Sequence, residues 1–249
     1  MRRALATAAL LAAAAPLPGA AAARGIALSA SPLRLTLQGA ASAAIILRNP
    51  GRRALLVDVS RAGFARSLRG LPRVRPASGA AEWLRLGPRR LRLAPGAAAT
   101  LRVVAAPPKR AAPGDHPALV LLTTVPVGAR HVRIRLRLGV VVNLHVAGRI
   151  VRRLDLRALV VRRRGRVRWL EVRLANRGNV TERLGGRRLR LVLRRRGRTF
   201  AILRPRRREL LPHSVGIVEF PYAGRVRGAV VARVELGPPG RSRSFRVRL

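Results

Sequence analysis

This sequence has no cysteine, few aromatic residues and few acidic ones. The lack of cysteine excludes a disulfide framework, a thiolate metal site, a cysteine nucleophile and attachment through a lipidated N-terminal cysteine. Phe, Trp and Tyr make up 3% of the chain, which argues against single-stranded nucleic-acid binding because that function uses aromatic stacking surfaces. The nine acidic residues are scattered among arginines. We therefore expect surface ion pairs rather than the paired, perturbed carboxylates of general acid–base catalysis.

Other catalytic and metal-binding patterns are also missing from the sequence. The four histidines are not spaced as metal ligands, and there is no Gly-x-Ser-x-Gly nucleophile motif. A hydrolase site in the segment 61–81 would need acids or a base, but that segment offers only Ser67 and Ser78. We expect no enzyme activity, no catalytic residues, no cofactor and no metal.

Positive charge is abundant. Lysine and arginine together number 53, Lys109 is the single lysine, and the formal net charge is +44. A body this basic attracts polyanions at low salt, so anionic cell-wall polymers and lipid head groups are candidate partners. Part of the arginine excess is consistent with a GC-rich genome, since the commonest arginine codons are GC-rich.

The first 23 residues resemble a secretory signal peptide. Arg2 and Arg3 form a basic start, residues 4–15 form an apolar stretch, and small residues at 21–23 suit cleavage after Ala23. No later segment has the roughly 18 consecutive apolar residues of a membrane-spanning helix. We predict export to the cell surface, a periplasm-like space or the exterior, which argues against a specific nucleic-acid partner.

The remaining chain contains one pattern twice. Strand-like runs surround Asn49-Pro-Gly51 and again Asn176-Arg-Gly178, and the segment 91–104 is echoed by 208–220. Elements that recur in the same order indicate two copies of one unit. We predict domains at 24–148 and 149–249, with Gly148 as the hinge.

Both copies read as all-β. Short apolar runs of period two are separated by Gly and Pro turns, and arginine occupies the alternate positions that face solvent. This pattern is typical of immunoglobulin-like sandwiches. We expect residues 132–146 to form one long strand, residues 61–81 to form a long loop with at most one short strand, and Trp169 to pack in a core.

Several turn and strand motifs resemble those of bacterial cell-surface proteins with pilus-chaperone-like domains. The motifs in the first copy are Ser31-Pro32, Asn49-Pro-Gly51, Trp83-Leu84 and Pro113-Gly-Asp-His116, and those in the second are Asn176-Arg-Gly178 and Leu211-Pro212. The group includes the WxL-interacting surface proteins of Gram-positive bacteria. The resemblance implies two tandem immunoglobulin-like β-sandwich domains after the signal peptide.

Two binding functions follow from this resemblance. The first is a non-enzymatic binding or scaffold protein of the cell surface that engages a protein partner or an anionic envelope polymer. The alternative is a periplasmic-type chaperone that binds surface or pilus subunits by strand addition at an exposed edge. Pilus chaperones grip a subunit's terminal carboxylate with two basic residues, and Arg34 and Arg135 occupy comparable strands here. The sequence does not indicate the oligomeric state.

Overall fold

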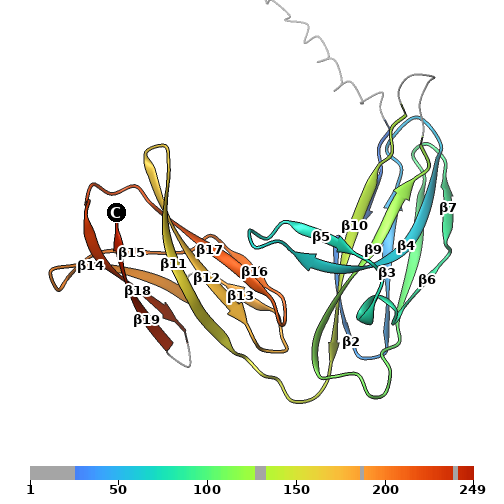
Figure 1. Ribbon diagram of the computed structural model, residues 1–249. Coiled ribbons are helices and arrows are strands. Elements are labelled where there is room, and N and C mark those ends of the chain that lie inside the picture. The colour runs from blue at the N-terminus through green and yellow to red at the C-terminus, as the bar shows by residue number, and fades with distance from the viewer. Residues whose placement is uncertain (1–25, 127–132, 186–187, 238–240) are drawn as a thin grey trace, which may run out of the picture.

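The computed structural model describes residues 26–126, 133–185, 188–237 and 241–249 (Figure 1). The predicted signal peptide lies outside these residues. The described chain is built from strands, with one 3-10 helix at Gly79–Ala81, and none of its helices is long and apolar enough to cross a bilayer. The all-β prediction is confirmed.

The first sandwich packs a four-stranded sheet against a larger sheet. The first sheet has the order β1-β3-β8-β6 and the second has the order β2-β10-β9-β4-β5, with β7 also paired to β4. The strands of the first sheet are β1 (Ser29–Ser31), β3 (Ala41–Arg48), β8 (Ala98–Ala105) and β6 (Leu84–Gly87), and those of the second are β2 (Arg34–Gln38), β10 (Arg137–Val146), β9 (Gly114–Thr124), β4 (Leu55–Arg66), β5 (Pro72–Arg75) and β7 (Arg90–Leu93).

Alternation along these strands fills the first core. In β2, for example, Leu35 and Leu37 are buried while the residues on either side are exposed. Successive side chains of a strand point to opposite faces, so one face meets the facing sheet and the other meets water. Ile45, Leu101 and Val142 come from strands of both sheets and are fully buried in one cluster.

The second sandwich has its own core. Its sheets have the orders β11-β12-β17 and β15-β14-β18-β19, with a short β13-β16 ladder beside them. Leu170, Leu191 and Phe220 lie in a buried cluster distinct from the first. The strands are β11 (Leu154–Arg164), β12 (Val167–Asn176), β17 (Val215–Tyr222), β15 (Arg198–Leu203), β14 (Leu189–Arg195), β18 (Ala229–Leu236), β19 (Arg241–Arg248), β13 (Glu182–Leu184) and β16 (Arg208–Leu210).

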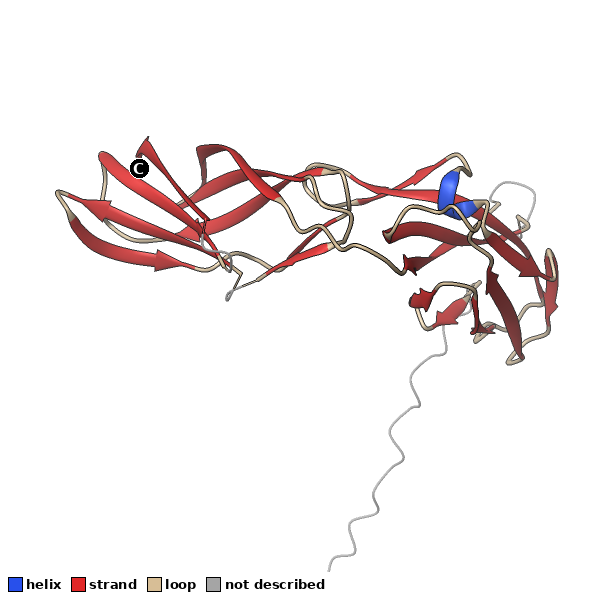
Figure 2. Ribbon diagram, turned by 90° about the horizontal axis from the view of Figure 1, so that it is seen from below, coloured by secondary structure: helices blue, strands red, loops and turns tan. Residues whose placement is uncertain are grey.

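The two sandwiches follow one another along an elongated body made almost entirely of strands (Figure 2). The chain passes from the first to the second between Val146, where β10 ends, and Leu154, where β11 begins. Gly148 lies in this connection with φ of 133°, a backbone conformation that other residues rarely adopt. The prediction of tandem sandwiches is confirmed.

The asparagine of the repeated Asn-x-Gly motif makes the same set of hydrogen bonds in both sandwiches. The Asn49 side chain donates to the carbonyls of Arg53, Leu93 and Ala94, and its Oδ1 accepts from the N–H of Gly51.

Asn176 repeats this geometry. It donates to the carbonyls of Val180, Leu210 and Leu211 and accepts from the N–H of Gly178. Both asparagines are buried, with exposures of 0% and 1%. Each one therefore ties the turn that follows it to a distant strand end.

The segment 61–81 differs from the loop expected for it. β4 continues to Arg66, turns through residues 67–71 and returns as β5, forming a hairpin that projects from the first sandwich toward the second (Figure 1). The Gly-, Ser- and Arg-rich composition suggested a loop because the hairpin has little apolar alternation. Its tip contacts the other sandwich, and local sequence does not reveal such contacts.

Two further expectations need correction. Trp169 does not pack in the core; it is half-buried on the outer face of β12, where the guanidinium carbons of Arg164 and Arg206 lie 5.4 and 4.8 Å from its ring centre. The long strand expected at 132–146 begins at Arg137, and Val132 lies outside the described residues.

Candidate functional site

The cleft between the two sandwiches contains a cavity of about 300 Å³. Its walls come from both halves of the chain and are mainly polar. The first sandwich contributes Arg34, Thr36, Phe64, Asp115, Pro117, Val141 and Asn143, and the second contributes Arg152, Thr181, Glu182, Arg183, Arg188, Glu209 and Leu211.

Arg34 lies in this cleft at the start of β2. Its guanidinium donates to both carboxylate oxygens of Glu209 on β16, with N–O distances of 2.9 and 2.8 Å. Such two-point pairing is the strongest arrangement between arginine and a carboxylate. The chain's own Glu209 therefore occupies the hydrogen-bonding edge that Arg34 would offer to an external carboxylate.

Glu209 is surrounded by positive charge. Arg66 approaches it at 3.1 Å and Arg183 at 3.5 Å, in addition to Arg34. Burial acts to raise the pKa of Glu209, but the hydrogen bonds and charge of Arg34, with the charges of Arg66 and Arg183, outweigh it and hold this pKa below its usual value. Glu209 is therefore ionised at neutral pH.

Asp115 on β9 makes a second contact across the cleft. One carboxylate oxygen lies 2.8 Å from Nδ1 of His145, and the other accepts from the N–H of Thr181 at 2.8 Å. Burial raises the pKa of Asp115, yet the hydrogen bonds from His145 and Thr181 prevail, so the pKa lies below its usual value. Asp115 thus joins the two sandwiches in its charged form.

A third acid in the cleft is almost completely buried. The Glu182 side chain is 2% exposed, and Arg152 and Arg188 contact its two oxygens at 3.0 and 3.1 Å. Leu211 adds an apolar contact, packing in a cluster with Phe64 and Leu119 of the first sandwich. Polar and apolar contacts together fix how the sandwiches meet in this cleft.

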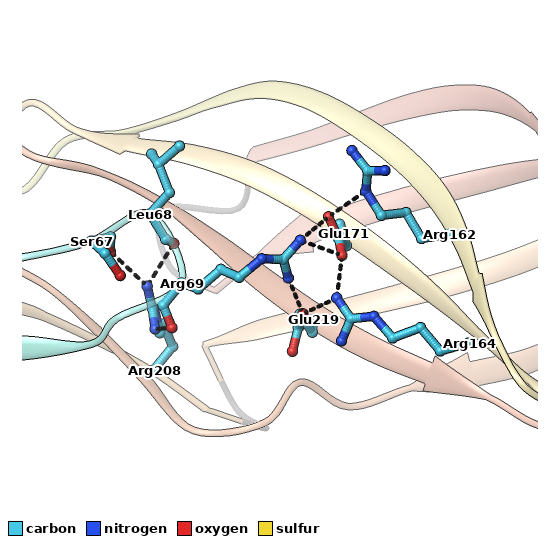
Figure 3. Close-up of polar contacts among 8 residues, drawn as sticks. All are labelled: Ser67, Leu68, Arg69, Arg162, Arg164, Glu171, Arg208 and Glu219. Carbon is cyan, nitrogen blue, oxygen red and sulfur yellow. Dashed lines mark hydrogen bonds and ion pairs between the residues drawn. The ribbon is translucent and has the colours of Figure 1, made fainter.

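The tip of the β4–β5 hairpin makes a further set of contacts with the second sandwich (Figure 3). The carbonyl of Leu68 accepts from the N–H of Ile217 on β17 at 2.8 Å. Arg208 on β16 donates to the carbonyls of Ser67, Leu68 and Arg69. The hairpin tip is therefore held through its backbone.

Arg69, at the same tip, extends to two carboxylates of the second sandwich (Figure 3). It lies 3.0 Å from Glu171 and 2.6 Å from Glu219. Its hydrogen bond and charge interaction with Glu171 are the main reasons why the pKa of Arg69 is raised above its usual value.

Arg135 is not brought to Arg34. It is exposed and precedes β10, whereas the residue of β10 paired with Arg34 is Val141. Six residues of extended chain span about 20 Å. Beside Arg34, β10 presents Val141 and Asn143 to the cleft, so its wall there has no second basic residue, and the arginines opposite come from the second sandwich.

The outer edge of β10 is half covered. β9 pairs with the full length of β10 on one side, from Arg137 to Val146, whereas β2 pairs on the other side with residues 141–145 alone. The N–H of Val141 points to the β2 side, where it bonds to the carbonyl of Leu33. Alternate residues of a strand point their N–H groups the same way. The N–H groups of Arg137 and Gly139 therefore face outward, and no strand in the described residues pairs with them.

Apolar side chains accompany this free edge. Leu138 packs partly against the first core, and Ile134, just before the strand, is 47% exposed. The sequence signal for this region was the alternation of Ile134, Leu136 and Leu138 with arginines. The cleft residues Glu209 and Asp115 had no such signal because Arg34 and Thr181, their partners across the cleft, lie far away in the sequence.

Eight of the nine acidic residues pair with arginine or histidine, in line with the sequence analysis, although Glu171 and Glu182 are buried rather than at the surface. The side chain of the ninth, Glu82, makes no ion pair with the described residues. Among the described residues, no three His, Asp or Glu side chains gather as a metal site. The contacts described above join the two sandwiches, and one edge of β10 is unpaired at residues 137–140 among the described residues.

Comparisons with known proteins identify the fold. No family model and no curated protein sequence matches this chain. The crystal structure of the class 5 fimbriae chaperone CfaA aligns with a TM-score of 0.51 and 9% identity over 89% of this chain and 98% of that one. A Salmonella enterica SafA pilin–SafB chaperone complex gives a TM-score of 0.49 with 14% identity over 92% of this chain and 99% of the matched chain. This chain has the two-domain immunoglobulin-like fold of pilus chaperones.

Proposed function

We propose that this chain is an exported, non-enzymatic chaperone that binds a partner subunit by strand addition. The partner strand would pair with the free edge of β10 at Arg137–Val140. The observation that carries the proposal is the pair of outward N–H groups of Arg137 and Gly139, which β2 leaves uncovered. Main-chain hydrogen bonds at such an edge supply affinity, and alternate side chains supply specificity.

Three features of the chain support this function. The fold is shared with a fimbriae chaperone over 98% of the length of that protein. The exposed Ile134 and the half-buried Leu138 offer apolar side chains to a partner groove beside the edge. The first 23 residues suit export. In this proposal residues 24–148 form the domain with the edge, and residues 149–249 form the second domain.

Two substitutions of Gly139 distinguish the loss of its backbone N–H from the effect of adding a side chain. Proline at this position removes the outward N–H and leaves the pairing with β9 intact, because the N–H groups of Leu138 and Val140 serve that ladder. Alanine keeps the N–H, and its Cβ would meet Leu119 and Leu121 at ordinary contact distances of 3.5 and 3.8 Å. Gly139→Ala is therefore the matched control for Gly139→Pro.

The experiment places a photocrosslinking amino acid at Ile134 in the full chain, expressed in its native envelope. A discrete crosslinked partner that persists with Gly139→Ala and disappears with Gly139→Pro supports strand addition. Equal crosslinking by both variants, or none from the unchanged chain, contradicts it.

The second candidate is a cell-surface scaffold, similar to WxL-interacting proteins, that binds an anionic envelope polymer or lipid head groups. The formal charge of +44 favours this function. Polymer binding would fall steeply with salt and would not distinguish Gly139→Pro from Gly139→Ala. The same two variants thus separate the two functions.

A further inference from the structure

A second cavity lies where the β4–β5 hairpin meets the β13–β16 ladder. Its volume is about 640 Å³, which is within the range of small-molecule binding sites. The hairpin contributes Arg66 and Gly70 to its wall. The second sandwich contributes Arg183, Leu184, Gly185, Arg207, Arg208 and Glu209.

The charges around this cavity do not balance. Four arginines line it with one carboxylate, Glu209. That carboxylate is already bound at two points by Arg34, which lies outside this cavity. Glu209 therefore cannot neutralise four guanidinium groups as well, and the wall carries an excess of positive charge.

The arginines also have hydrogen-bonding capacity to spare. Nε of Arg66 and Nε of Arg208 are enclosed and have no acceptor among the described residues. Burial, together with the charge of Arg66, lowers the pKa of Arg208. Buried donors without acceptors are uncommon in folded proteins, so the protein's own groups do not fully satisfy the arginines at this wall.

Two of the four arginines are open to an incoming ligand. The Arg183 side chain is 76% exposed, and among the described residues its one ion pair is a 3.5 Å approach to Glu209. Arg207 is exposed as well, and no hydrogen bond or ion pair of its side chain occurs within the described residues. These two side chains are the first that an anion entering the cavity would meet.

We propose that this cavity binds a ligand carrying several linked phosphate groups. Guanidinium groups pair with phosphate oxygens at two points and without losing their charge. Each phosphate group presents several oxygens, so it satisfies arginines that approach from different sides better than a planar carboxylate does. The cavity exceeds the size of a single phosphate group, and its four arginines match a ligand of several negative charges.

The site is independent of the strand edge proposed above, because it shares no residue with β10. Its walls come from both sandwiches, so a bound ligand would tie the hairpin to the second sandwich. A ligand that binds the folded chain alone raises its apparent stability with concentration. Thermal unfolding therefore reports binding without any knowledge of the partner subunit.

The test titrates tripolyphosphate into the full chain at high, constant ionic strength, with calorimetry and melting temperature as readouts. We expect saturable binding at one site, and in Arg183→Met/Arg207→Met a loss of affinity of about tenfold or more, the size expected for charged hydrogen bonds. Arg246→Met/Arg248→Met is the control, because both residues are exposed on β19 and the variant has the same net charge. Its affinity should match that of the unchanged chain.

Three outcomes overturn the proposal. One is the absence of saturation in the unchanged chain, and another is equal weakening in both double variants, which would indicate general attraction to a basic body. The third is binding of citrate as tightly as tripolyphosphate, which would assign the site to carboxylates. Circular dichroism of both variants shows whether the fold is retained.

Discussion

Glu171 on β12 and Glu219 on β17 lie directly opposite each other in neighbouring antiparallel strands. Like charges in this position repel unless cations lie between them. Arg69 and Arg164 each contact both carboxylates, and Arg162 contacts Glu171 as well. Because Arg69 comes from the first sandwich, the repulsion between two acids of the second sandwich is relieved by the other half of the chain.

Arg69→Met should loosen the contact between the sandwiches. Arg69 is 45% exposed, so solvent weakens its ion pairs, and we expect a loss of about 1 kcal/mol in the free energy of unfolding. Small-angle scattering should show a wider range of arrangements of the two sandwiches. Arg73→Met is the control, since Arg73 is exposed on β5 of the same hairpin. Scattering and urea midpoints identical to those of Arg73→Met would show that the hairpin tip does not hold the sandwiches.

Because Asn49 and Asn176 make matching contacts, their substitution should lower the free energy of unfolding by similar amounts. Asn49→Ala and Asn176→Ala should each cost about 2–4 kcal/mol, because each leaves several buried backbone groups without partners. Aspartate keeps the acceptor and loses the donor, so Asn→Asp should be no better than Asn→Ala. Urea unfolding measures all four variants. A cost below about 0.5 kcal/mol, the range of ordinary surface changes, would refute this role.

These asparagines also show what sequence reasoning could reach. The same order of elements after Asn49 and after Asn176, with later Leu-Ala-Pro and Leu-Leu-Pro segments, predicted the repeat. The turn at Gly96 has its counterpart at His213, and both residues have positive φ. The alternation of apolar and polar residues predicted many of the strands. These features are local or repeated, so they leave a pattern in the sequence.

The cleft and the hairpin left no comparable pattern. Glu209 is 175 residues from Arg34, and Arg69 is 102 residues from Glu171. In a chain with 53 basic residues, every acid has many possible partners, and only the fold selects among them. The resemblance to pilus chaperones suggested Arg135 as a companion of Arg34, whereas the structure places Arg152, Arg183 and Arg188 in the same cleft.

Acid should weaken the contact between the sandwiches through Asp115. The pKa of Asp115 in the folded chain lies below the ordinary value of 3.8. The ionised Asp115 therefore stabilises the fold fully at pH values above the ordinary pKa, and this stabilisation is lost as pH falls through the folded pKa. Urea midpoints of the unchanged chain should therefore drop steeply below about pH 4. Asp115→Asn, which cannot ionise, should be less stable at neutral pH and have a flatter acid profile. Parallel profiles for the two proteins would contradict this role.

Replacing the buried Arg168 with an apolar residue should stabilise the chain. It is 8% exposed, and its cross-strand neighbours on β11 and β17 are Arg163 and Tyr222. No ion pair or hydrogen bond of its side chain occurs among the described residues, in contrast to the buried Glu171 and Glu182. Burial, with the charges of Arg227 and Arg163, lowers the pKa of Arg168.

Methionine at this position keeps the apolar stem and removes the charge, so Arg168→Met should raise the melting temperature. Arg166 lies on the exposed turn between β11 and β12, so Arg166→Met should leave the melting temperature nearly unchanged. A lower melting temperature for Arg168→Met would show that the guanidinium makes a favourable contact.

Glu209→Gln tests whether Arg34 is a binding group or a structural one. In the folded chain Glu209 occupies Nη1 and Nη2 of Arg34, the end-on edge that could bind a ligand's carboxylate at two points. The amide keeps the shape and loses the charge, so it holds Arg34 less firmly. If Arg34 receives a subunit's terminal carboxylate, as the chaperone resemblance implies, Glu209→Gln should bind peptides with a free C-terminus several-fold more tightly than the unchanged chain, and amidated peptides should show no gain. Calorimetry with both peptide forms measures this difference. If Glu209→Gln lowers stability and the two peptides bind equally, Arg34 has a structural role. Its charge-assisted pairing with Glu209 would then serve to hold the two sandwiches together.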